Sequence, residues 1–284
     1  MPSLPDMMTP NAAGLAAGQT GEASDAPRIG TPETRDALFE VLLRLGDNTL
    51  ILGHRVSEWC GHAPVLEEDI ALANIALDLI GQTQFWLGLA GEVEGAGRSA
   101  DDLAFLRDVM DLRNLLLVER PNGDFGHTLM RQYLFDAWHY PMLRGLVQSS
   151  EPRIAEIAEK ALKEVSYHLE RSSDLVVRLG DGTSESHARM QDALDTLWPY
   201  TGEMFIADAH EATLAEAGII PSPDSLRDDW NAHVNATLAE ATLKRPEGDF
   251  AHKGGKQGTH HTEHLGHLLA EMQWLQRAYP GATW

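Results

Sequence analysis

Four side chains that could bind metal ions or carry protons lie on otherwise apolar helical stretches. They are Glu58, Asp78, Asp136 and His168, one on each of four stretches. A four-helix bundle with inward-facing carboxylates can hold two metal ions, which takes a Glu from each of two helices and a Glu-x-x-His pair from each of the other two. The i, i+3 spacing places both members of such a pair on one helix face. These residue types therefore make a di-metal site a candidate.

The Glu-x-x-His pairs are incomplete in this sequence. The residue three before His168 is Val165, which has no donor atom, and the residue three after the second-helix aspartate is Gly81, which has no side chain. Glu164 precedes His168 by four residues and could approach it at a different angle. Because two of six ligands are missing, the pattern favours buried polar residues that pair with one another or with Lys163.

The spacing around one turn predicts how two of these helices align. If the chain turns at Glu151-Pro152, Asp136 lies 15 residues before the turn and His168 lies 16 residues after it. The two side chains are therefore expected to be level across the hairpin.

Five histidines near the end of the chain form a second group of candidate ligands. They are His252, His260, His261, His264 and His267. Separations of three and four residues at a helix start can bind zinc. A helix that begins only at Thr262-Glu263, and the lack of a third type of ligand, favour a solvated polar segment instead.

The single cysteine and several missing motifs narrow the chemistry further. Cys60 cannot form an internal disulfide, and its apolar helical context predicts an inert packing thiol in a reducing cytoplasm. The sequence contains no GxGxxG after a strand, no GxxxxGKS/T, no GxSxG and no CxxC. It therefore lacks the signatures of dinucleotide, P-loop, nucleophile-elbow and dithiol sites.

The composition describes a globular, strongly acidic chain. Its 284 residues include 22 Lys+Arg and 43 Asp+Glu, a formal net charge of −21, and 43% are hydrophobic. A surface of this charge repels phosphate backbones and anionic membranes, so neither a nucleic acid nor a membrane is an expected partner. Because no apolar run approaches ~18 residues and no secretory signal is evident, we expect a cytoplasmic protein.

Long stretches with helical periodicity are expected to position these residues. The 3.6-residue spacing of apolar side chains predicts four long helices, over 31–63, 67–94, 124–148 and 152–180. Shorter helices are expected near 100–118, 186–206, 224–242 and 262–278. Long helices joined by short turns predict an all-α antiparallel bundle. Residues 1–33 lack an apolar period and are expected to form a flexible leader, followed by a single helical domain over 34–284.

Several short motifs, in order along the chain, carry a family resemblance. They are Leu45-Gly46-Asp47-Asn48, Glu58-Trp59-Cys60-Gly61-His62-Ala63-Pro64, Leu72-Ala73-Asn74-Ile75-Ala76-Leu77-Asp78-Leu79, Asn114-Leu115-Leu116-Leu117-Val118-Glu119, Glu119-Arg120-Pro121-Asn122-Gly123, Arg131-Gln132-Tyr133, Thr262-Glu263-His264-Leu265-Gly266 and Leu269-Ala270-Glu271-Met272-Gln273. Together, from about residue 40 to Trp284, they resemble the PaaC-type subunits of bacterial ring 1,2-phenylacetyl-CoA epoxidases.

The resemblance implies a ferritin-like four-helix bundle with additional C-terminal helices. It also implies a non-catalytic structural role beside a related PaaA-type catalytic subunit that carries the di-iron centre. Where that relative has Ser-Glu, Asp-Glu-x-x-His and Glu-x-x-His, this chain has Ser57-Glu58, residues 77–81 and residues 164–168, with substitutions at the ligand positions. The implied assembly epoxidises the CoA-linked ring with oxygen and with electrons from a reductase subunit, while this chain holds no cofactor.

Two other functions stay open on the residues alone. One is an independent di-metal oxygenase with an atypical ligand set of Glu58, Asp78, Asp136, Glu164 and His168. The other is a small-molecule or metal carrier that uses the His252–His267 segment.

Overall fold

The described part of the chain is entirely helical in its regular structure. The computed structural model describes residues 30–248 and 250–282, and within these ranges it contains no β-strand. Residues 1–29 of the predicted leader lie outside the described residues. None of the helices in the described ranges is both long and apolar enough to cross a lipid bilayer.

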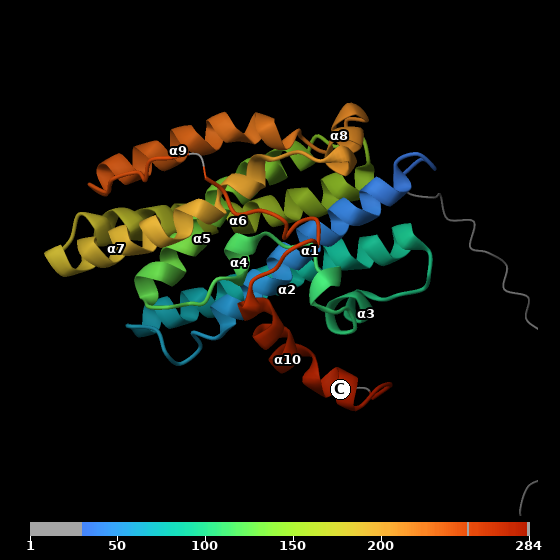
Figure 1. Ribbon diagram of the computed structural model, residues 1–284, viewed down its shortest axis with the longest axis horizontal. Coiled ribbons are helices and arrows are strands. Elements are labelled where there is room, and N and C mark those ends of the chain that lie inside the picture. The colour runs from blue at the N-terminus through green and yellow to red at the C-terminus, as the bar shows by residue number, and fades with distance from the viewer. Residues whose placement is uncertain (1–29, 249, 283–284) are drawn as a thin grey trace, which may run out of the picture.

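The helices follow one another with short connections (Figure 1). The four long ones are α1 Arg35–Ser57, α2 Leu66–Glu94, α5 Phe125–Leu146 and α6 Pro152–Gly180. The shorter α-helices are α3 Ala100–Phe105, α4 Leu116–Glu119, α7 Ser184–Leu197, α8 Ala209–Glu216, α9 Arg227–Glu240 and α10 Glu263–Ala278. Four 3₁₀ turns complete the series, η1 Val109–Asp111, η2 Trp198–Tyr200, η3 Gly202–Phe205 and η4 Pro223–Leu226.

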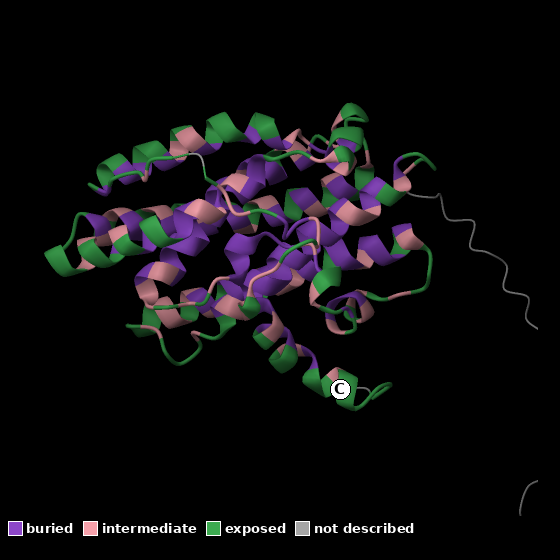
Figure 2. Ribbon diagram, in the orientation of Figure 1, coloured by how far each residue is buried: buried purple, intermediate pink, exposed green. Residues whose placement is uncertain are grey.

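The four long helices form the bundle that the sequence predicts. Helix α1 packs on α2, α5 packs on α6, and α2 packs on α6, while the short α4 contacts both α1 and α5. Helix α5 is buried along almost its whole length, and α6 buries one face only (Figure 2). The all-α, ferritin-like fold is therefore confirmed, with α7–α10 added after the bundle.

Local sequence signals set several helix ends as expected. The acids Glu67, Glu68 and Asp69 lie in the first turn of α2, where they meet the positive end of the helix dipole. Helix α2 ends at Gly95, whose φ of 71° is the left-handed conformation that favours glycine. Helix α6 starts with Pro152, a residue suited to the first helical position.

The predicted helix over 100–118 is wrong, because long-range contacts break it. Asp47 of α1 forms a buried ion pair with Arg107, and its carboxylate also accepts a hydrogen bond from the backbone N–H of Arg113 at 2.8 Å. These contacts hold 106–115 as a loop with one 3₁₀ turn. A partner about sixty residues away leaves no signal in local periodicity.

The first long helix ends earlier than predicted. It stops at Ser57 and is followed by turns through Gly61, whose φ is 81°. Cys60 consequently lies in these turns and is exposed. The expectation of a buried packing thiol on a helix is therefore wrong.

Candidate functional site

Two polar contacts join α2 to α6 across the bundle. Asp78 Oδ2 lies 3.0 Å from His168 Nε2, and Gln82 Nε2 donates to Glu164 Oε2 at 2.9 Å. The later residue of α2 meets the earlier residue of α6, so the two helices run antiparallel. Two of the predicted site residues are thus brought together, and Glu164 contacts an amide rather than the His168 ring.

Asp136 is fully buried on α5, where amide and hydroxyl groups surround it. Gln132 Nε2 donates to one carboxyl oxygen at 2.7 Å and Ser172 Oγ donates to the other at 2.9 Å. Burial raises the pKa of Asp136 to about 7, against the opposing effects of His168 and of these two hydrogen bonds. On α6, the residue that donates to Asp136 is Ser172. Ser172 lies one helical turn after His168, the residue that was predicted to be level with Asp136.

A second histidine lies close to this group and was not among the predicted site residues. His139 follows Asp136 by three residues on α5 and is 2% exposed. Burial, together with the charge of His168, lowers the pKa of His139 to about 3, so its ring is neutral at physiological pH. The Asp-x-x-His spacing of 136–139 is the signal that could have found it.

Two predicted positions point away from the bundle interior. Glu58 follows the last residue of α1, and its side chain is 43% exposed beside Arg55 Nη1 at 3.0 Å and Asn122 Nδ2 at 2.7 Å. Its expected inward orientation is wrong, because α1 ends before it. A Cβ atom on Gly81 would meet no other atom within 4 Å. The neighbouring Gln82 takes the inward place on α2.

Apolar residues occupy the positions that would need carboxylates. Val165, three before His168, and Leu79, three before Gln82, are both fully buried. Lys163, the predicted alternative partner of the buried acids, is exposed and pairs with Glu159 at 3.9 Å, so that prediction is wrong. Within 30–248 and 250–282, no three His, Cys, Asp or Glu side chains are grouped as a metal ion would require.

The C-terminal histidines make separate contacts. His261 Nδ1 lies 2.5 Å from Glu119 Oε1, while its Nε2 faces the carbonyl oxygen of Leu112 at 3.2 Å. The ring of His252 stacks on Tyr200 with centroids 4.5 Å apart. His260 precedes α10, so its spacing to later histidines does not place them on one helix face. His252 and His261 thus make separate contacts, and among the described residues no three of the five histidines are grouped as a metal ion would require.

Two buried glutamates anchor this segment, and neither was predicted. Glu119 accepts hydrogen bonds from Asn114 Nδ2 at 3.0 Å and from the backbone N–H and hydroxyl of Thr262, each at 2.7 Å. Glu203 accepts hydrogen bonds from the backbone N–H groups of Leu116, Gly254 and Lys256. Both carboxylates therefore have several donors, which compensates for burying their charge.

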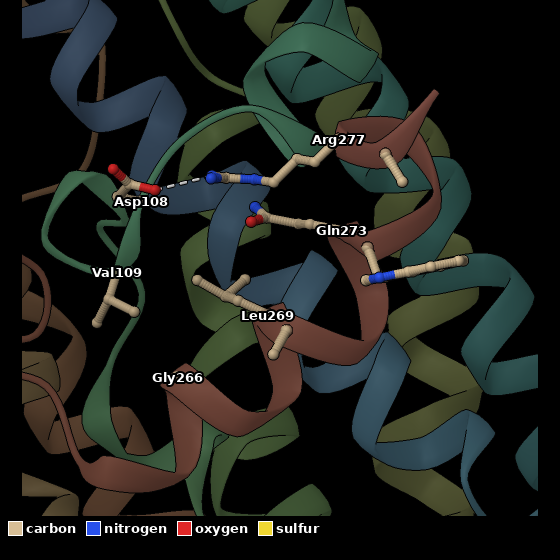
Figure 3. Close-up of a pocket in the computed structure, with 9 residues that line it drawn as sticks. Asp108, Val109, Gly266, Leu269, Gln273 and Arg277 are labelled. Carbon is tan, nitrogen blue, oxygen red and sulfur yellow. Dashed lines mark hydrogen bonds and ion pairs between the residues drawn. The ribbon is translucent and has the colours of Figure 1, made fainter. Parts of the chain in front are cut away.

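A cleft of about 490 Å³ separates α10 from the loop before η1 (Figure 3). Arg277 crosses it to pair with Asp108 at 2.9 Å, and the side-chain amide of Gln273 donates to the carbonyl oxygens of Ala104 and Arg107. These groups are engaged in attaching α10 to the body. The polar side chains that line the cleft therefore hold α10 against the rest of the protein.

The amino-acid sequence matches a known family. The profile of the phenylacetic acid catabolic protein family (PaaA and PaaC) covers residues 21–284, and the chain belongs to this family. The chain is 51% identical over 242 residues to the C-type subunit of the 1,2-phenylacetyl-CoA epoxidase of Escherichia coli (strain K12), an alignment that spans 85% of this chain and 97% of the relative.

Proposed function

We propose that this chain is a non-catalytic structural subunit of a cytoplasmic phenylacetyl-CoA epoxidase in aerobic phenylacetate catabolism. It pairs with and stabilises a PaaA-type subunit that carries the di-iron centre, and a reductase and further subunits complete the assembly. The identity to the E. coli subunit supports the assignment to this enzyme. The observation that carries the structural role is the pair of buried apolar residues, Leu79 and Val165, each three residues before a polar side chain that faces the interior.

The donor set in the bundle does not fit two iron ions. Asp78 is engaged with His168, and Asp136 with Gln132 and Ser172. The raised pKa of Asp136 favours its uncharged form, whereas two close cations need several anions. We assign these residues the role of holding α2, α5 and α6 in register through the contacts of Asp78 with His168, Gln82 with Glu164, and Asp136 with Ser172.

The test compares the chain alone with the chain co-expressed with the PaaA-type subunit. We expect the isolated chain to contain no stoichiometric iron and to be inactive, and we expect activity with phenylacetyl-CoA only from the pair supplied with its reductase. Metal analysis and a single-turnover assay measure these properties. Two irons per isolated chain together with oxygen-dependent turnover would establish the alternative, an independent di-metal oxygenase.

A further inference from the structure

Helix α2 keeps an apolar face that nothing in the described chain covers. Leu66 is 71% exposed, Leu77 is 66% exposed and Ile70 is 54% exposed. With 3.6 residues per turn these positions share one side of the helix. We define the α2 outer face by Leu66, Ile70, Leu77, Gly81, Phe85 and Gly88, which share that side with the exposed, uncharged Asn74 and Gln84.

Beyond the acidic first turn of α2, the face carries little charge. From Leu66 to Gly88 it extends about 33 Å at 1.5 Å per residue. Asp78 is the sole ionisable residue between Ile70 and Gly91, and it is paired with His168. On α6, the exposed Tyr167 shares a helix side with Lys160, whose Nζ lies 4.2 Å from the ring centroid of Phe85, so this aromatic residue extends the face. Depletion of charge around exposed aromatic and aliphatic groups is typical of the centre of a protein interface.

No contact within the chain requires a glycine at two positions on this face. A Cβ atom on Gly81 or Gly88 would meet no atom within 4 Å. By contrast, a Cβ on Gly46 of α1 would lie 2.5 Å from Leu87 Cδ2, so that glycine permits α1 to approach α2. A glycine inside a helix costs about 1 kcal/mol relative to alanine. Gly81 and Gly88 therefore keep a flat surface on which an outside backbone can approach closely.

The net charge argues against a second copy of this chain as the partner on this face. Each chain carries a formal charge of −21, so two copies placed face to face repel one another. A different subunit with a neutral or basic rim avoids this repulsion. We infer that the α2 outer face docks an apolar helical face of the catalytic subunit of the same enzyme. This inference rests on the proposed function and specifies the surface that performs it.

The experiment measures how tightly the PaaA-type subunit, co-expressed or separately purified, binds variants of this chain that each change one surface. Leu77→Arg places an unpaired charge at the centre of the face, and Gly81→Leu with Gly88→Leu fills the flat surface. Ala236→Arg, at an exposed position of α9 on the other edge of the bundle in Figure 1, is the matched control. We expect each change on α2 to weaken binding about 100-fold and the control to bind like the unchanged chain.

Thermal unfolding of the isolated variants distinguishes an effect on docking from an effect on folding. The glycine double variant is expected to unfold at a slightly higher temperature, because leucine has the higher helix propensity. Equal binding by all variants would overturn the assigned surface and leave the proposed function standing. No binding by the unchanged chain would overturn the proposed function, and with it this occupant. A homodimer that Leu77→Arg dissociates would overturn the choice of partner.

Discussion

Asp136 and His139 lie one helical turn apart on α5, and burial moves their pKa values in opposite directions. The pKa of Asp136 rises to about 7, so the stability it contributes is present at low pH and is lost as the pH rises from about 4 towards 7. The pKa of His139 falls to about 3, so the stability it contributes is present above about 6.5 and is lost as the pH falls towards 3. Between about pH 4 and 6.5 the two effects cancel.

Replacing Asp136 with asparagine is expected to expose the effect of His139. The amide keeps the size of the protonated carboxyl but does not titrate, so the free energy of unfolding of Asp136→Asn should rise with pH between about 4 and 6.5. Over the same range, the contribution of these two groups in the unchanged chain is flat. Urea unfolding at a series of pH values measures the difference. Parallel curves for both proteins would show that Asp136 titrates normally in the folded chain.

Iron affinity is a second property of these residues that can be tested. Restoring donors at the inward positions, with Leu79→Glu, Gln82→His and Val165→Glu together, is expected to give measurable Fe²⁺ binding. Val165→Glu with Gly81→His is the matched control, because position 81 faces outward and its histidine does not reach the interior. Titration calorimetry and metal analysis compare the two variants. Equal iron binding by both would contradict the inward register assigned to Gln82.

Among the elements, the long helices could be predicted and the breaks between them could not. Periodicity and terminal signals indicate α2, α5 and α6 because each is determined within its own sequence. The loop over 106–115 depends on Asp47, and the attachment of His261 depends on Glu119, which is 142 residues earlier in the chain. At the candidate site, the contact between Asp78 and His168 joins two predicted residues. Glu58 was misplaced because α1 ends just before it.

Removing the charge of Glu119 is expected to loosen the C-terminal segment. Glu119→Gln cannot accept the full set of bonds from Asn114, His261 and Thr262, so we expect a loss of about 2–4 kcal/mol in the free energy of unfolding. Hydrogen exchange should become faster in residues 252–265 before it changes in α5. Glu58→Gln, at an exposed acid, is the control and should change little. Unchanged exchange in 252–265 would show that Glu119 is not their anchor.

At the scale of the whole molecule, the acidic charge opposes compactness and self-association. Because one chain carries a formal charge of −21, screening of that charge by salt stabilises both the folded state and any paired state. We expect the thermal midpoint of the isolated chain to rise by several degrees as NaCl increases from about 10 to 150 mM, since the Debye length falls towards 8 Å. Differential scanning fluorimetry measures it, with sucrose at matched osmolality as the control. A midpoint that falls with salt would mean that attractive ion pairs outweigh the repulsion.

The attachment of residues 254–262 to Glu119 and Glu203 has a consequence for biosynthesis. Both carboxylates lie in the interior, and many of their donors belong to residues made more than fifty positions later. Until residues 254–262 are present, burying these two anions costs free energy, because their donors are missing. The native interior around Glu119 and Glu203 is therefore completed only after residues 254–262 have been made.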